Sequence, residues 1–264
     1  GQGMPEGMRL QCVGFCGIDD SVDPRLLAAI TESYPWVEWG VLFHDEKQGQ
    51  PRFASLEWVD DLKIFAENAK MRLAGHLCSK YVLQLLGGDD SFVQEMKTKG
   101  FKRFQLNPTK ANNVDSSKLT SAMVERLVEV AGKHQEIEFI IQRNEETKIL
   151  WEGLMGKPSC PANVSFLFDE SKGRGTVSDG YSPAPPGVLF GYAGGLGPAN
   201  IAEELQKMEV AAQGRSIWID MESSLRTLQE GGKDVFDVCK VMRCVSEVIA
   251  SGFQSDKYSK RARG

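Results

Sequence analysis

The sequence predicts a (β/α)8 barrel, in which eight parallel strands alternate with helices and close into a single sheet. Three observations lead to this prediction. Short apolar, β-branched runs recur down the chain, and most are followed by a stretch with helical periodicity. Successive runs begin about 24 to 36 residues apart, close to the ~30 residues of one βα unit. The length of 264 residues suits one barrel domain. An open doubly wound sheet is the alternative.

Each predicted strand is a short run of apolar and β-branched residues bounded by polar or turn-forming residues. In chain order these runs are Gln11–Phe15, Val37–Phe43, Arg72–Cys78, Phe101–Leu106, Ile137–Gln142, Val164–Phe168, Val188–Tyr192 and Ser216–Asp220. Each predicted helix has apolar residues three and four positions apart. In order these are Pro24–Ser33, Leu56–Ala69, Phe92–Lys99, Ser121–Gly132, Glu145–Met155, Ala199–Lys207 and Val235–Ala250. Between Ser171 and Gly187, glycines and prolines predict a loop instead.

We expect one barrel domain over residues 10–252, with an N-terminal extension at 1–9 and a basic C-terminal tail at 253–264. The opening Gly-Gln-Gly lacks the basic segment and apolar core of a signal peptide, and is expected to be a cloning remnant. The tail carries Lys257, Lys260, Arg261 and Arg263. Such a short basic end is more often a solvated tail than a binding arm.

The overall composition excludes several classes of protein. A net charge of −5 and a pI near 5.4 argue against nonspecific nucleic-acid binding. No apolar run reaches the ~18 residues that a membrane span requires. Six cysteines without a Cys-x-x-Cys pair favour reduced thiols and a cytoplasmic location. The sequence leaves a homodimer open.

Two residues at predicted strand ends could carry acid–base chemistry, because barrel active sites lie at the carboxyl ends of the strands. Cys16 is followed by Gly17, where a partly exposed thiol could act as a thiolate base. The alternative is a small buried residue. Asp169 ends an apolar run, so desolvation would favour its protonated form and suit it to general acid catalysis. A helix cap or an ion pair is the alternative there.

Glycine-rich loops after the sixth and seventh predicted strands suggest an anion site, because glycines let backbone N–H groups approach a phosphate. The residues concerned are Gly173, Arg174 and Gly175 in one loop and Gly194 and Gly195 in the other. Polar side chains at other strand ends are pocket candidates, namely His76, Gln105, Asn107, Gln142 and Asp220. His76 and Cys78 share a face, but no third ligand is identifiable, so we predict neither a metal nor a cofactor.

In their order along the chain, these motifs resemble those of phosphoribosylanthranilate isomerase, a (β/α)8 enzyme of tryptophan biosynthesis. The resemblance implies that Cys16 is the general base, that Asp169 is the general acid, and that Arg52 contacts the substrate. It also places phosphate at the two glycine loops and near Ser223 and Ser224. The matching segments are Gly14–Ile18, Pro51–Phe53, Phe166–Asp169, Gly173–Thr176, Ala193–Leu196 and Asp220–Ser224.

Three positions depart from the family's pattern. Leu225 follows the two serines where the family has glycine, Arg174 replaces a glycine, and Asn107-Pro108 stands where the family has His-Gly. The resemblance implies an Amadori-type isomerisation of an N-linked aminoaldose phosphate to an aminoketose. The ligand would be a small phosphorylated sugar or another anionic metabolite. The alternatives are a phosphosugar-binding barrel with a different substrate and a catalytically silent relative.

Overall fold

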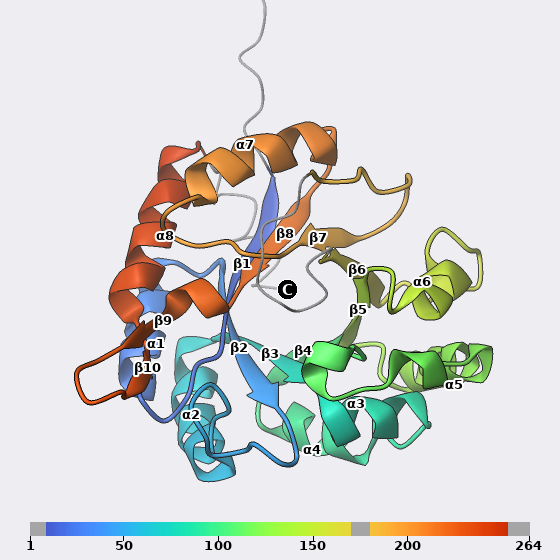
Figure 1. The fold of residues 1–264 in the computed structure, drawn as a ribbon, viewed down its shortest axis with the longest axis horizontal. Coiled ribbons are helices and arrows are strands. Elements are labelled where there is room, and N and C mark those ends of the chain that lie inside the picture. Colours follow the sequence, from blue (N-terminus) through green and yellow to red (C-terminus); the bar gives the residue numbers. More distant parts are fainter. Residues whose placement is uncertain (1–8, 170–179, 253–264) are drawn as a thin grey trace, which may run out of the picture.

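The structure is a computed structural model that describes residues 9–169 and 180–252. It confirms the predicted (β/α)8 barrel. Eight parallel strands follow one another around a closed sheet, and β1 pairs with both β2 and β8. This closure, visible in Figure 1, excludes an open doubly wound sheet. The strands are β1 (Leu10–Cys16), β2 (Val37–Phe43), β3 (Arg72–Leu77), β4 (Phe101–Leu106), β5 (Glu138–Arg143), β6 (Val164–Phe168), β7 (Phe190–Tyr192) and β8 (Ile217–Met221).

Helices surround the sheet, and side-chain caps mark the starts of the first two. The carboxylate of Asp23 accepts the backbone N–H of Arg25 at the start of α1, and Ser55 Oγ accepts that of Trp58 at the start of α2. Both of these helices coincide with their predicted ranges. The helices are α1 (Pro24–Ser33), α2 (Leu56–Ala69), α3 (Ser79–Leu86), α4 (Ser91–Thr98), α5 (Ser121–Lys133), α6 (Lys148–Leu154), α7 (Ile201–Ala212) and α8 (Val238–Ala250).

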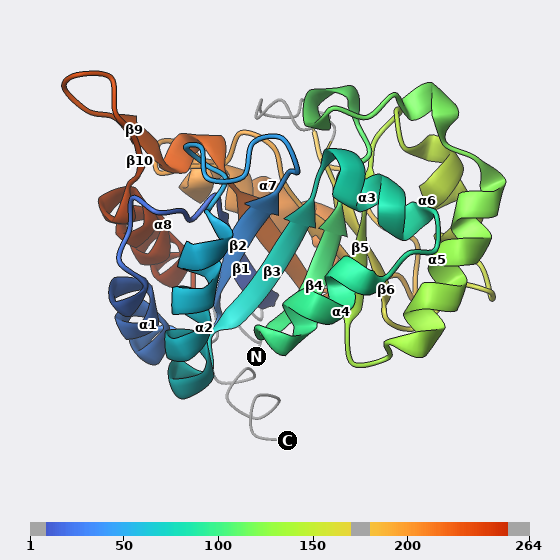
Figure 2. The same cartoon turned by 90° about the horizontal axis from the view of Figure 1, so that it is seen from below.

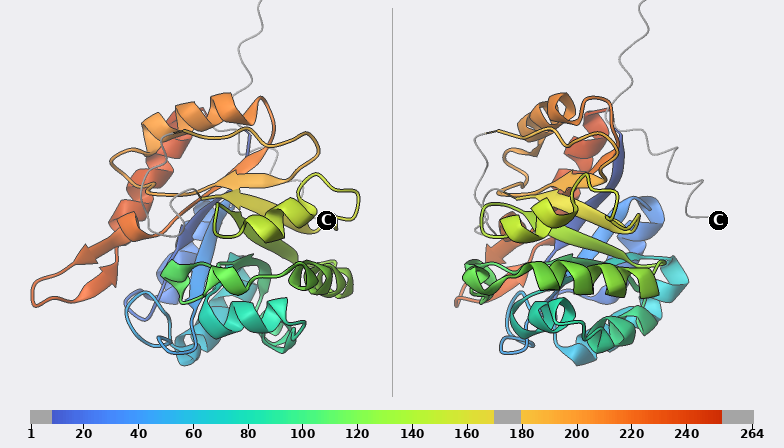
Figure 3. Two further views of the ribbon diagram at one scale, coloured as in Figure 1. Left: turned by 45° about the vertical axis from the view of Figure 1, so that its right-hand side comes forward. Right: turned by 90° about the vertical axis from the view of Figure 1, so that its right-hand side faces the viewer.

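Several predicted bounds shift by a few residues, and two parts of the fold differ more from the prediction. Helix α3 was not predicted, although it buries Val82, Leu85 and Leu86. The predicted helix Val235–Ala250 begins only at Val238, because Asp237 accepts the backbone N–H groups of Cys239 and Lys240 and caps it there. The residues before this cap form an antiparallel hairpin of β9 (Arg226–Leu228) and β10 (Asp234–Phe236), which projects from the barrel in Figure 3.

Side chains alternate along each strand between the helix-facing core and the barrel interior. The large apolar core lies between the strands and the helices. The interior holds a smaller cluster of Cys12, Ile140, Leu167, Ala193 and Trp218. Toward the amino ends of the strands lies a buried ionic layer, and toward their carboxyl ends lies a polar cavity. In Figure 2 the carboxyl ends of β2, β3 and β4 point to the top of the view. No helix in the described ranges is long and apolar enough to cross a membrane.

The interior packing makes Gly191→Ala a test of the barrel core. A Cβ at this position would lie 2.4 Å from Trp218 Cδ2 and Cε2, inside van der Waals contact with a buried ring. We expect the substitution to lower the free energy of unfolding by about 1–3 kcal/mol, as overpacking does. Urea denaturation measures this loss.

Gly132→Ala is the matched control for that substitution. Gly132 lies in α5, and a Cβ there meets nothing within 4 Å. We expect this variant to gain about 0.5–1 kcal/mol from higher helix propensity. Equal unfolding midpoints for wild type and Gly191→Ala would show that Trp218 can move aside at no cost.

Candidate active site

A polar cavity of about 60 Å³ lies at the carboxyl ends of the strands. It brings together ten residues predicted from the sequence: His76, Gln105, Asn107, Gln142, Asp169, Gly194, Gly195, Asp220, Ser223 and Ser224. Glu222 also lines it, and no lysine or arginine does so among the described residues. Ligand pockets are typically ~300–1,000 Å³, so only one end of a substrate fits inside this cavity. Gly173, Arg174 and Gly175 lie outside the described residues.

Asp169 and Gln142 form one wall of the cavity. Asp169 directly follows β6, and Gln142 lies near the end of the neighbouring strand β5. Gln142 Nε2 donates a hydrogen bond of 2.8 Å to Asp169 Oδ2. Both side chains are buried. The carbonyl oxygen of the same amide, Gln142 Oε1, is buried with no hydrogen-bond partner in the described part of the chain. This wall therefore offers an acceptor to a hydroxyl or N–H group of a ligand.

Asp220 lies in the barrel interior at the end of β8. It is beside Gly14, where a Cβ would come within 2.4 Å of Asp220 Oδ1, so only glycine leaves room for this carboxyl group. The side chain is 9% exposed. Burial raises the pKa of Asp220 well above its usual value, and the nearby carboxylates of Glu38 and Glu222 raise it further. The protonated form, which can donate a hydrogen bond, is favoured.

Glu222 lies two residues beyond Asp220, and no role was predicted for it. Two-residue spacing places side chains on the same face of a strand, and that spacing was the available signal. Burial raises its pKa, whereas the guanidinium groups of Arg52 and Arg226 oppose that shift. Arg52 lies 3.8 Å from Glu222 Oε1 and 3.6 Å from Asp234 Oδ2. Arg52, which was predicted to contact the substrate, thus lies between two carboxylates. It is at the rim of the cavity and is not part of its lining.

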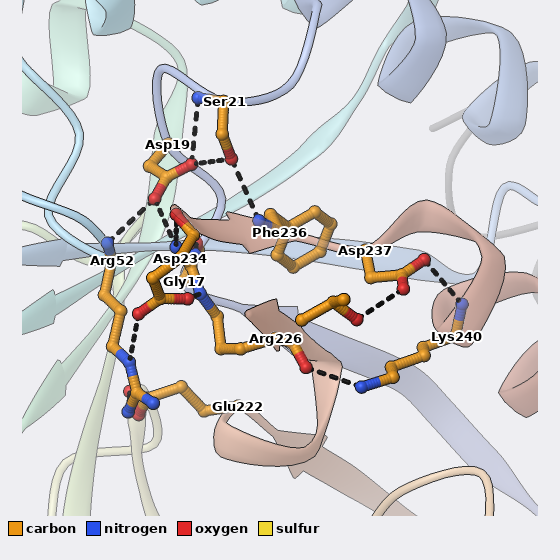
Figure 4. A network of polar contacts seen from close by, with 11 residues as sticks. Gly17, Asp19, Ser21, Arg52, Glu222, Arg226, Asp234, Phe236, Asp237 and Lys240 are labelled. Atoms are coloured by element: carbon orange, nitrogen blue, oxygen red, sulfur yellow. Dashed lines mark hydrogen bonds and ion pairs between the residues drawn. The ribbon is translucent and has the colours of Figure 1, made fainter. Parts of the chain in front are cut away.

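A network of polar contacts holds this rim in place (Figure 4). Arg226, on β9, donates to the Gly17 carbonyl and to Asp19 Oδ2, each at 2.8 Å. Asp19 Oδ2 also accepts the backbone N–H of Arg52 at 2.8 Å, which ties down a residue with a φ of 78°. The hairpin therefore positions the loops after β1 and β2.

Cys16 differs from its expected environment. The expectation that its thiol is partly exposed is wrong. Cys16 is fully buried in a cluster with Leu42 and Cys78, against which Phe53 packs. It does not line the cavity. Burial raises the pKa of Cys16 well above its usual value, and the carboxyl groups of Glu222 and Asp220 raise it further. These effects favour the thiol over the thiolate, and the environment matches the alternative of a small buried residue.

The glycine loop after β7 forms another wall of the cavity. Gly194 and Gly195 have φ values of 113° and 65°, in the left-handed region that favours glycine. Asn200 braces the loop by donating to the Gly195 carbonyl at 2.8 Å and accepting the Gly197 N–H at 2.9 Å. Ser224 packs so closely that a Cβ on Gly197 would lie 2.3 Å from its Cβ. The two segments predicted to bind phosphate are thus in contact.

His76 lines the cavity as a neutral imidazole. Burial, together with the charge of Arg103, lowers its pKa to about 3. Within the described ranges, no three His, Cys, Asp or Glu side chains form a group that could hold a metal ion.

Comparisons with known proteins establish the fold. A scan of protein-family models and a search of curated proteins found no match. A glycoside hydrolase family 30 xylanase from Clostridium acetobutylicum has a TM-score of 0.56 at 9% identity, covering 88% of this chain and 70% of its own. Tryptophan synthase from M. tuberculosis has a TM-score of 0.53 at 15% identity, covering 93% of each chain. Triosephosphate isomerase from Bartonella henselae has a TM-score of 0.51 at 11% identity, and the match covers 83% of this chain and 93% of the isomerase.

These three structures have different activities on one architecture, so the similarity reaches only the fold. Fold and cavity together define the chain as a (β/α)8 barrel protein with an acidic, polar cavity at the carboxyl ends of its strands.

Proposed function

We propose that the chain is an isomerase that converts an N-linked aminoaldose phosphate to an aminoketose by acid–base catalysis, as its resemblance to phosphoribosylanthranilate isomerase implies. The observation that carries the proposal is the cavity, which joins Asp169 to the carboxyl groups at the end of β8 and to the Gly194–Gly195 loop. A sugar needs hydrogen-bonding groups on several sides, and this lining supplies them.

Asp169, protonated, donates a proton to the ring oxygen of the sugar. The bond from C1 to that oxygen breaks, and the amine nitrogen forms an iminium with C1. A base then removes the proton at C2 to give an enolamine, which relaxes to the ketone. The acid must start protonated and the base deprotonated. Differences in burial and in neighbouring charge can separate the pKa values of two such groups.

The phosphate of the substrate binds at the wall of the cavity that the Gly194–Gly195 loop and the Ser223–Ser224 segment form. Backbone N–H groups of Gly194 and Gly195 and the hydroxyls of Ser223 and Ser224 are suited to an anion. The three carboxyl groups of the cavity instead suit the sugar hydroxyls and the amine.

The second candidate is a barrel that binds a phosphosugar without isomerising it. The burial of Cys16 favours this candidate, because a thiol outside the cavity lining cannot reach a substrate carbon. The two candidates predict the same ligand class and different chemistry.

Thermal unfolding with a panel of ligands tests the ligand class. An aminoaldose phosphate at 100 times its Kd should stabilise the protein by about 2.7 kcal/mol. Inorganic phosphate and the unphosphorylated amine are the controls, and we expect both to stabilise it less. Equal stabilisation by the unphosphorylated amine would remove phosphate from the proposal. NMR of the same mixtures then detects aminoketose, which the silent candidate does not form.

A further inference from the structure

The proposed reaction needs a proton acceptor that faces the substrate, and Cys16 is buried outside the cavity lining. The described lining contains three carboxyl groups. Asp169 has the acid role, and Asp220 favours its protonated form, because burial and the neighbouring carboxylates raise its pKa well above the usual value. The side chain of Glu222 is 35% exposed and lies at the mouth of the cavity, where a substrate carbon can approach it.

Glu222 also lies in the same sector of the barrel as the predicted base. It follows β8, which pairs directly with β1. A Cβ on Gly17 would lie 3.5 Å from Glu222 Cγ, so the glutamate side chain passes over the residue after Cys16. The carboxylate of Glu222 therefore faces the cavity beside the end of β1, where the thiol of Cys16 is buried.

The charges around Glu222 suit a proton acceptor. Burial raises its pKa, whereas Arg52 and Arg226 lower it, and the net shift is upward. Asp220 and the thiols of Cys16 and Cys78 also lie within electrostatic range of it. A carboxylate with a raised pKa is a stronger base than an ordinary one.

The geometry points to Glu222 as the proton acceptor of the isomerisation, with Arg52 as the residue that positions it. This inference rests on the proposed function. It places the two reacting carboxyl groups directly after β6 and β8, with the β7 loop between them.

The proton transfers balance with these two groups alone. Asp169 gives its proton to the ring oxygen as the C1–O bond breaks and the C1–N iminium forms. Glu222 takes the proton from C2, whose C–H electrons form the C1–C2 double bond while the C1–N π electrons return to nitrogen. Glu222 then returns the proton to C1, and the C2 hydroxyl gives its proton to Asp169 as the ketone forms. Both residues regain their starting states.

Glu222→Gln tests the assignment, with Glu230→Gln as the matched control. Glutamine keeps the size and polarity of the side chain but cannot accept the C2 proton. We expect at least a ~100-fold loss of kcat for Glu222→Gln, a loss larger than that of Cys16→Ala. Glu230 lies in the exposed turn of the β9–β10 hairpin, so its substitution should leave turnover at the wild-type level. Glu222→Asp retains a carboxylate and should recover part of the activity.

The possible outcomes separate the two proposals. A wild type that forms no aminoketose overturns the proposed function and, with it, the role of Glu222. An active wild type whose Glu222→Gln variant keeps its turnover overturns the Glu222 assignment alone. The same holds if Cys16→Ala loses more than Glu222→Gln does. Thermal melts of each variant show whether it is folded, and a Glu222→Gln variant that fails to fold leaves Glu222→Asp to decide.

The pH profile tests the positioning role of Arg52. Because the base must be deprotonated, kcat/KM falls as pH falls through the pKa of Glu222. Arg52→Met removes a positive charge that lowers this pKa. The acidic limb should therefore move to higher pH in Arg52→Met, and an unmoved limb would overturn the positioning role.

Discussion

Asp169→Asn is expected to lower the turnover of an aminoaldose phosphate by at least ~100-fold and to leave the barrel folded. Asparagine still accepts the 2.8 Å hydrogen bond that Gln142 Nε2 donates. It cannot release a proton to the ring oxygen, so ring opening loses its acid. Turnover followed by NMR measures the loss, and thermal melting measures the fold.

Asp61→Asn is the control for that variant. Asp61 is an exposed residue of α2 that does not line the cavity, and the substitution makes the same chemical change. Its turnover should equal that of the wild type. Wild-type turnover in Asp169→Asn would refute the acid role of Asp169.

Arg103→Met should lower the free energy of unfolding by about 3–5 kcal/mol, the usual cost of removing one partner from a buried ion pair. Arg103 lies in the barrel interior, where it contacts Glu38 at 2.7 Å and Glu138 at 2.9 Å. Its guanidinium also lies 4.6 Å from the centre of the Trp218 ring. Burial acts to raise the pKa of Glu138, but Arg103 outweighs it, and the net shift is downward. Without the arginine, the buried carboxylate of Glu38 loses its ion-pair partner, and the partly buried Glu138 keeps only the hydrogen bond from Ser165 and the more distant charge of Arg72.

Urea denaturation measures this loss, with Lys102→Met as the matched control. Lys102 is the exposed neighbour on the same strand, and we expect a change within about 0.5 kcal/mol for it. Adding Glu38→Gln to Arg103→Met should recover part of the lost stability, because the two effects are not additive within one network. A loss below about 1 kcal/mol in Arg103→Met would mean that water or a rearranged side chain replaces the arginine.

Much of the fold was predictable from local patterns. Three strands, Val37–Phe43, Phe101–Leu106 and Val164–Phe168, were predicted with the bounds that the structure has. Buried parallel strands are continuous apolar runs between turn residues, and such runs are visible in the sequence. The hairpin β9–β10 was missed because its strands are only three residues each. They depend on contacts such as Arg226 with Asp19, which are remote in the chain.

Most of the cavity was also predictable, and for a topological reason. The carboxyl ends of parallel strands meet on one face of a barrel, so polar residues at strand ends converge whatever their separation in sequence. His76, Gln142, Asp169 and Asp220 were found in this way, and all four line the cavity.

The pattern of residues along the chain thus specified the (β/α)8 fold and the end of the barrel where the polar groups gather, because periodicity and strand direction are local properties. Which of those groups is exposed depends on neighbours from distant segments. Leu42 and Phe53 cover Cys16, whereas Arg52 and Arg226 stabilise a carboxylate at Glu222. Burial and electrostatic environment arise when the sheet closes, and for that reason the folded chain alone distinguishes the buried thiol from the accessible acid.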